Sequence, residues 1–123
     1  MGLAVSDPLG ITAQGLETFD TRSGVDLVDY IGELAERYDV EEIVVGHPVG
    51  LLGQKGSSTG RAAALAKALE SRLGLRVTLW DERFSSEEAK RVLRGMRRGK
   101  AAVDKLAAVI ILQSYLEYRR KTD

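Results

Sequence analysis

Three carboxylates in the second half of the chain have the spacing of a site for a divalent cation. Asp81 and Glu82 directly follow an apolar run at residues 75–80, and the carboxyl end of such a strand is where open α/β sheets bind ligands. Asp104 stands just before a second apolar run, at residues 106–112. Mg²⁺ is commonly held by one or two carboxylates, with water and substrate phosphate completing its shell. Because side chains alternate along a strand, Asp81 and Glu82 face opposite ways, so only one of them can face a given site. Glu82 and Asp104 fit the role of ligands of one shared cation, and which of Asp81 and Glu82 faces it is left open.

The segment between these carboxylates is the most basic part of the chain. Residues 90–105 contain one acid, Asp104, and seven cations: Lys90, Arg91, Arg94, Arg97, Arg98, Lys100 and Lys105. The formal net charge is zero, but residues 1–60 hold 3 basic and 10 acidic side chains (−7), and residues 61–123 hold 15 and 8 (+7). Such a patch attracts polyanions whatever the net charge. Carboxylates inside a positive surface are what a metal-dependent nuclease requires, and Arg83 is then expected near the scissile phosphate.

Each of these residues also has a structural interpretation. Acidic residues after a strand often form turns, Arg83 is a natural ion-pair partner for Asp81, and Asp104 has the position of a helix N-cap stabilised by the helix dipole. A basic run is equally typical of a solvated helix face and loop. The single histidine, His47, precedes a proline and is more typical of a packed loop residue than of a ligand or base. The glycine-rich loop after it lacks the lysine and serine order of a phosphate-binding loop.

The composition excludes several classes of site. With 123 residues and 13.4 kDa, the chain is expected to form a single domain, residues 1–123, that buries about two-thirds of its unfolded surface. Because it contains no cysteine, disulfides, thiolate chemistry and sulfur-based zinc sites are excluded. No run of 18 apolar residues and no signal-peptide pattern is present, so we expect a cytoplasmic protein with no part in the membrane.

The elements that position these residues alternate as in an α/β fold. Two strands joined by a turn at residues 7–10 are predicted first, over residues 2–6 and 11–13, with residues 15–20 extending the second. Periodicity then predicts an amphipathic helix and a buried strand, over residues 25–35 and 42–46.

A parallel βαβ unit is predicted in the middle of the chain. The strand at residues 42–46 is followed by a helix that starts at residues 57–59 and ends before Gly74, and then by the strand at residues 75–80. Parallel strands end on the same edge of a sheet, so His47 and the acidic residues after the second strand are expected there together. The last helix is predicted over residues 103–120.

Four motifs, in their order and spacing, resemble those of the YqgF/RuvX family: Gly2-Leu3-Ala4-Val5-Ser6-Asp7, Val45-Gly46-His47-Pro48, Asp81-Glu82-Arg83-Phe84-Ser85-Ser86, and Val103-Asp104-Lys105-Leu106-Ala107-Ala108 with Ile110-Ile111-Leu112. This family comprises bacterial proteins assigned as Holliday junction resolvases and as nucleases that mature the 5′ end of pre-16S ribosomal RNA. The resemblance implies an α/β fold of the ribonuclease H-like type, a mixed sheet with flanking helices. It also implies catalytic roles for Glu82, with Asp81 as the alternative, and for Asp104.

One part of the family pattern is missing from this sequence. Family members begin with another strand that carries an Asp-x-Gly motif, whereas this sequence begins inside the following strand, at Met1-Gly2-Leu3. The resemblance therefore implies a sheet without its N-terminal strand and a site without its first aspartate. Two-metal cleavage needs a carboxylate that bridges the cations, and two carboxylates alone are expected to hold one Mg²⁺ weakly. The open edge of the strand at residues 2–6 is expected to favour self-association.

Three functions follow from these observations. The leading hypothesis is a nuclease dependent on Mg²⁺ or Mn²⁺, held by Glu82, Asp104 and Asp81, that acts on structured RNA such as pre-16S rRNA or on branched DNA such as a Holliday junction. The second is a module that binds RNA or the ribosome without cleavage, because the first aspartate is missing beside an intact basic patch. The third, a phosphotransferase of the actin-like superfamily, is weaker because the chain is too short for two lobes that enclose ATP. No residue identifies a contact to a 2′-hydroxyl, so RNA and DNA are not distinguished.

Overall fold

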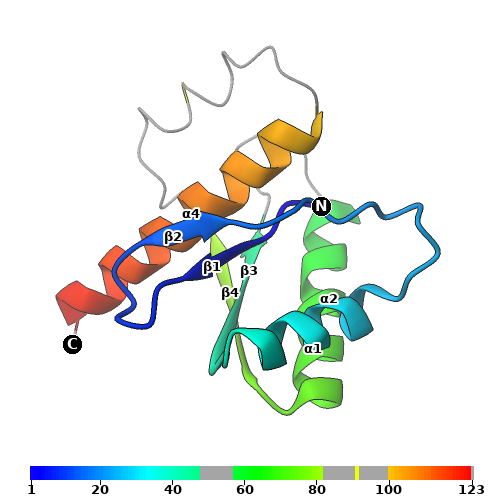
Figure 1. Cartoon of the computed structure of the whole chain (residues 1–123), viewed down its shortest axis with the longest axis horizontal. Coiled ribbons are helices and arrows are strands. Elements are labelled where there is room, and N and C mark those ends of the chain that lie inside the picture. Colours follow the sequence, from blue (N-terminus) through cyan, green and yellow to red (C-terminus); the bar gives the residue numbers. More distant parts are fainter. Residues whose placement is uncertain (48–56, 82–90, 92–99, 123) are drawn as a thin grey trace. The chain divides into compact units, whose positions relative to one another are not determined.

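The computed structural model describes residues 1–47, 57–81, 91 and 100–122. These residues belong to two compact units (Figure 1). Unit 1 consists of residues 1–20 and 84–123, and unit 2 of residues 21–83. Antiparallel and parallel pairing both occur, and the described strands form a two-stranded sheet in each unit. The predicted mixed sheet of the ribonuclease H-like type stays a prediction. The single domain and the missing N-terminal strand stay predictions.

Unit 1 begins with a short hairpin. Strand β1 (Ala4–Ser6) pairs antiparallel with β2 (Ala13–Gly15). The amide of Gly10 donates to the carbonyl of Asp7 at 3.0 Å, and Gly10 has a φ of 69°, a conformation that glycine adopts without strain. The predicted turn at residues 7–10 is confirmed.

The connection between the two strands is longer than predicted. One carboxylate oxygen of Asp7 accepts hydrogen bonds from the amides of Ile11 at 2.7 Å and Thr12 at 2.9 Å. These bonds stabilise the charged carboxylate and lower the pKa of Asp7 below its usual value. Ile11 and Thr12 therefore belong to the loop, and β2 begins two residues after the start of the predicted strand at residues 11–13.

Backbone hydrogen bonds between the two chain segments continue beyond β1 and β2, but their register changes by one residue. The amide of Leu16 donates to the carbonyl of Leu3 at 2.9 Å, and Met1 and Phe19 exchange hydrogen bonds in both directions, each 2.9 Å long. With the register of Leu3 and Leu16, Met1 would face residue 18. The second strand thus contains one extra residue, which is the definition of a β-bulge. Backbone hydrogen bonds follow the predicted extension over residues 15–20 as far as Phe19, although β2 itself ends at Gly15.

Helix α4 (Lys100–Thr122) lies along this hairpin in unit 1 (Figure 1). It begins three residues earlier than the predicted helix over residues 103–120. The side chain of Gln113 holds helix and hairpin together, because its nitrogen donates to the carbonyl of Ile11 at 2.9 Å and its oxygen accepts from the amide of Ala13 at 3.0 Å.

The apolar run of α4 is less buried than its sequence suggests. Residues 106–112 are all half-buried. Among the described residues of unit 1, the buried side chains are Phe19 on the hairpin side and Tyr115 and Leu116 further along α4. No helix among the described residues has the length and apolar character needed to cross a membrane.

Unit 2 contains the predicted βαβ unit. Strand β3 (Glu42–His47) and strand β4 (Arg76–Asp81) are parallel and are joined by helix α2 (Ser57–Leu73). Helix α1 (Leu27–Arg37) precedes them and packs against α2. The core forms where these elements meet, and its buried side chains are Val28, Val45, Ala62, Ala66 and Leu69. Burial of this apolar surface is the main force that holds α2 on the sheet.

The start of α1 is fixed by a capping carboxylate. The side chain of Asp26 accepts hydrogen bonds from the amides of Val28 at 2.8 Å and Asp29 at 3.2 Å, which satisfies two of the amides that a helix leaves open at its N-terminus. Arg72, in the last turn of α2, reaches both Asp26, at 3.4 Å, and Asp29, at 2.5 Å. A single arginine therefore ties the end of one helix to the beginning of the other.

Candidate active site

Asp104 lies in the second turn of α4, not at its start. Because the helix begins at Lys100, four residues earlier, the interpretation of Asp104 as the N-cap is wrong. The Asp104 side chain is 30% exposed, and its Oδ2 atom lies 3.8 Å from the ammonium nitrogen of Met1. A half-exposed carboxylate beside one distant cation keeps oxygen lone pairs available, so its chemistry fits a ligand of a hard divalent cation.

Asp81 is the last residue of β4 and lies where the sequence placed it. The register pairs Asp81 with His47, the last residue of β3. The two parallel strands of unit 2 therefore end together, and the prediction that His47 and the acidic motif share one edge is confirmed for Asp81. Glu82 and Arg83, which follow directly, lie outside the described residues.

The structure does not test whether the predicted carboxylates share a cation. Asp81 belongs to unit 2 and Asp104 to unit 1, and Glu82 is among the residues that are not described. Within the described ranges, no three acidic, histidine or cysteine side chains form a group that would hold a metal ion. The shared cation between Glu82 and Asp104 stays a prediction.

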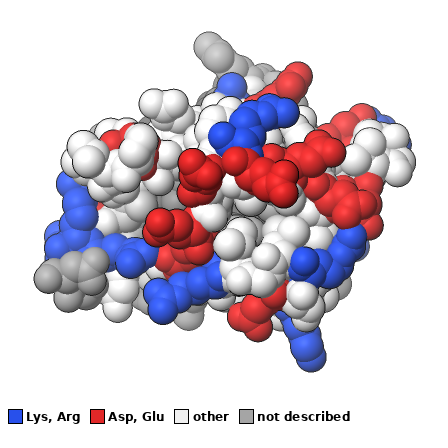
Figure 2. Space-filling model, turned by 60° about the horizontal axis from the view of Figure 1, so that its bottom comes forward, with Lys and Arg blue, Asp and Glu red and all other residues white. Residues whose placement is uncertain are grey.

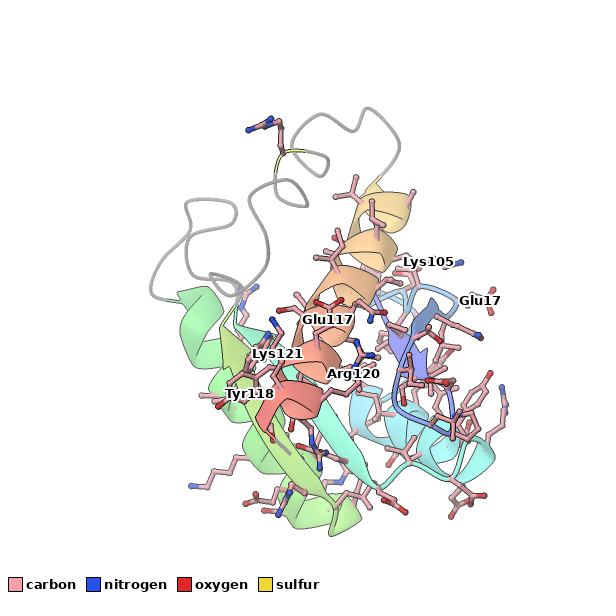
Figure 3. The ribbon with its side chains drawn as sticks, turned by 90° about the vertical axis from the view of Figure 1, so that its left-hand side faces the viewer. Glu17, Lys105, Glu117, Tyr118, Arg120 and Lys121 are labelled. Atoms are coloured by element: carbon pink, nitrogen blue, oxygen red, sulfur yellow. The ribbon has the colours of Figure 1, made fainter. Side chains whose placement is uncertain are left out.

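Two cations of the basic segment have described side chains. Arg91 and Lys105 are both exposed, whereas only the backbone of Lys100, at the start of α4, is described. Lys105 leaves α4 on the side of the hairpin, where Glu17 also lies, whereas Tyr118 and Lys121 leave the last turns on the opposite side (Figure 3). The other predicted phosphate-binding residues lie outside the described part of the chain: Lys90, Arg94, Arg97 and Arg98.

Charge on the described surface is grouped by sign. On the face drawn in Figure 2, acidic side chains gather together and basic side chains lie beside them in clusters of their own. Clusters of this kind produce local potentials that the zero net charge of the chain conceals.

Sequence reasoning missed two glycines that contact α4 beside Asp104. A β-carbon on Gly2 would overlap the main chain of Asp104, and one on Gly15 would lie 2.6 Å from the Cε atom of Lys105. Glycine inside a strand is a known sign of close backbone approach. The available signal was therefore the position of Gly2 and Gly15 in predicted strands, although the sequence did not show which element approaches them.

Comparison with known proteins identifies similar chains over nearly the whole length. A family model described as RuvX, Holliday junction resolvase, matches residues 1–118. A protein of Koribacter versatilis is 47% identical over 123 residues, which cover 97% of this chain and 80% of that protein. A protein of Lachnospira eligens is 45% identical over 128 residues (98% and 91%), and one of Listeria monocytogenes serotype 4b is 43% identical over 123 residues (95% and 89%). Each of the three carries the name "Putative pre-16S rRNA nuclease".

Proposed function

The chain belongs to the RuvX family, and on this premise we propose that it is a nuclease that processes the 5′ end of pre-16S rRNA. The observation that carries the proposal is the set of relatives at 43–47% identity, aligned with 95–98% of this chain, which are named "Putative pre-16S rRNA nuclease". Phosphodiester hydrolysis also agrees with the residues, because an acidic pair and Asp104 flank the most basic segment of the chain.

We propose that the cofactor is Mg²⁺ or Mn²⁺, held by Asp104 and Glu82, with Asp81 as a further ligand. When bound, such a cation lowers the pKa of a coordinated water and neutralises charge on the phosphate. The half-exposed carboxylate of Asp104 supports its place in this set, as does the position of Asp81 at the end of β4. Both offer oxygen ligands, which is the ligand type that these cations prefer.

The basic residues are proposed to bind the phosphate backbone. Lys105 is exposed next to Asp104 on α4, and no described residue forms an ion pair with it. Together with Arg83, Arg91 and the other cations of residues 90–105, it would hold phosphates on either side of the scissile bond. Such contacts position a backbone without reading bases, so we expect selectivity for the shape of the RNA rather than for its sequence.

Two other functions predict different outcomes in assays of cleavage and RNA binding. The family description names a Holliday junction resolvase, which predicts Mg²⁺-dependent cleavage of four-way DNA junctions in preference to pre-16S rRNA. A binding module that does not cut predicts RNA binding that weakens with salt and persists in chelator, with no cleavage under any metal.

The test compares cleavage by the parent protein with that by isosteric charge-removing variants. With a pre-16S rRNA 5′-end substrate and Mg²⁺, we expect Asp104→Asn and Glu82→Gln each to lower the cleavage rate by at least about 100-fold, since each removes a metal ligand. Glu33→Gln is the matched control, because the Glu33 side chain is exposed on α1 and is not one of the proposed metal ligands. Full activity in either site variant would refute the role of that residue, and activity of the parent in chelator would refute the metal.

A further inference from the structure

Gly2 brings the main chain of the hairpin into direct contact with the helix that carries Asp104. A β-carbon at this position would overlap the carbonyl group of Asp104 and would lie 2.9 Å from the amide nitrogen of Lys105. Both obstacles are backbone atoms of α4, so rotation of a side chain cannot relieve the overlap. Any residue other than glycine would force the hairpin and this turn of α4 apart.

Gly15 contacts the same turn of α4 in a softer way. The atoms nearest to a β-carbon on Gly15 would be those of the Lys105 side chain, with 2.6 Å to Cε and 3.0 Å to Cγ. The end of a lysine side chain moves at little cost, because it has several rotatable bonds. The two glycines therefore differ in how strictly a side chain is excluded. Gly2 contacts the backbone at Asp104, which cannot easily move, whereas Gly15 contacts the side chain of Lys105, which can.

We propose that Gly2 is a positioning residue that fixes the location of the Asp104 carboxylate for its metal ion. The inference rests on the proposed function, in which Asp104 holds Mg²⁺ or Mn²⁺. Mg²⁺ requires nearly ideal octahedral geometry at 2.0–2.1 Å, and a site loses function when its ligands move by about 0.5 Å or more. Displacing the main chain of α4 at Asp104 moves the carboxylate with it.

If Gly2 had a purely structural role, metal binding in Gly2→Ala and Gln113→Ala would change in the same way, because Gln113 also docks the hairpin on α4. Its two hydrogen bonds, to Ile11 and Ala13, lie nine residues along α4 from Asp104. Gln113→Ala loosens the hairpin without pressing on Asp104. If Gly2 only helped to dock the hairpin, Gln113→Ala and Gly2→Ala would weaken metal binding equally whenever they lower the thermal midpoint equally.

The experiment measures Mn²⁺ affinity, by electron paramagnetic resonance of free Mn²⁺, together with the thermal midpoint of each variant. We expect Gly2→Ala to weaken Mn²⁺ binding by about ten-fold or more, as for loss of a group that orients a metal ligand. Gln113→Ala and Gly15→Ala should stay within about two-fold of the parent. Gly60→Ala is the matched control, because Gly60 is an exposed glycine of α2 with nothing within 4 Å of its β-carbon position.

Two results overturn the inference: parent-like Mn²⁺ affinity in Gly2→Ala, or an equal loss in Gln113→Ala at equal thermal stability. If Gly2→Ala does not fold, Gly15→Val replaces it, because its added methyl groups press on the Lys105 stem and on the same turn of α4. A partial loss of Mn²⁺ affinity is then expected, and parent-like affinity overturns the inference.

Asp104→Asn separates this inference from the proposed function. If Asp104→Asn leaves Mn²⁺ binding unchanged, the metal site itself fails and the role of Gly2 fails with it. If Asp104→Asn abolishes Mn²⁺ binding and Gly2→Ala does not affect it, only the positioning role is lost.

Discussion

At the scale of single residues, the charge of Asp26 makes stability depend on pH. The amides of Asp29 and Val28 and the guanidinium of Arg72 favour its charged form and lower its pKa below the usual 3.8. A carboxyl whose pKa is lower in the folded state stabilises the fold above its unfolded pKa, and this contribution is lost as pH falls through the folded pKa. Asp26→Asn keeps a good N-cap but removes the charge.

We therefore expect Asp26→Asn to be less stable than the parent at pH 7 and to approach parent stability at an acidic pH well below 3.8, where the lowered pKa of Asp26 has been passed. Urea unfolding followed by circular dichroism at the two pH values measures the difference. A stability difference that is the same at both pH values would contradict the role of the charge. Glu33→Gln is again the control, since its side chain is exposed on the outer face of α1.

At the residue scale, only those site residues could be predicted whose side chains carry a functional group, such as a carboxylate. Asp81 and Asp104 were identified from their types and their positions beside apolar runs, and the register confirms that Asp81 ends its strand beside His47. The contact of Gly2 with α4 was not predictable, because a residue without a side chain gives no indication of its neighbour. The neighbour is set by how the hairpin docks, which involves residues about a hundred positions apart.

At the scale of elements, the ends of the helices show which boundaries can be predicted from the residue type alone. Gly74 ends α2 with a φ of 69°, as predicted, because glycine is the usual residue at this left-handed position. Helix α1 ends the same way at Asp39, with a φ of 52°. The amide of Asp39 donates to Glu36 and that of Val40 donates to Ala35, which is the Schellman pattern. The predicted helix over residues 25–35 stopped two residues short because aspartate is an uncommon residue at such a position.

Asp39 offers a direct test of this helix end. The left-handed conformation costs a residue with a β-carbon about 1–2 kcal/mol, and somewhat less for aspartate. We expect Asp39→Gly to raise the free energy of unfolding by about 0.5–1 kcal/mol, and Asp39→Ala to lower it slightly, since alanine has no polar side chain to favour this conformation. Chemical unfolding of the three proteins measures both changes. Equal stability of the glycine and alanine variants would show that the positive φ is not needed.

The remaining elements were predicted well where the sequence pattern that defines them is local, and poorly where it is not. The βαβ unit was predicted with ends correct to within about two residues, since its periodicity and its bounding glycine are local. The start of α4 was wrong because Asp104 has the appearance of an N-cap, while the preceding Lys100 carries no capping signal. The bulge between Met1 and Phe19 was not predicted either, because it depends on pairing across the hairpin and not on either strand alone.

At the scale of the whole molecule, the edge of β1 that faces away from β2 is the feature with the clearest consequence. In an antiparallel pair, backbone groups point alternately toward the partner strand and away from it. Leu3 bonds toward β2 through Leu16, so the N–H and C=O of Ala4 point to the opposite edge. No described strand pairs with that edge, and edges of this kind favour pairing with another chain.

We therefore expect the chain to self-associate through β1 and expect Ala4→Pro to suppress this. Proline removes an N–H that faces away from β2, so the hairpin bonds remain while the outer edge loses a donor. Light scattering across a range of protein concentrations measures the change in average mass. Ala4→Val is the matched control, because valine favours a strand and keeps the N–H, so it should associate like the parent. If the proline and valine variants have the same mass at every concentration, association through this edge is excluded.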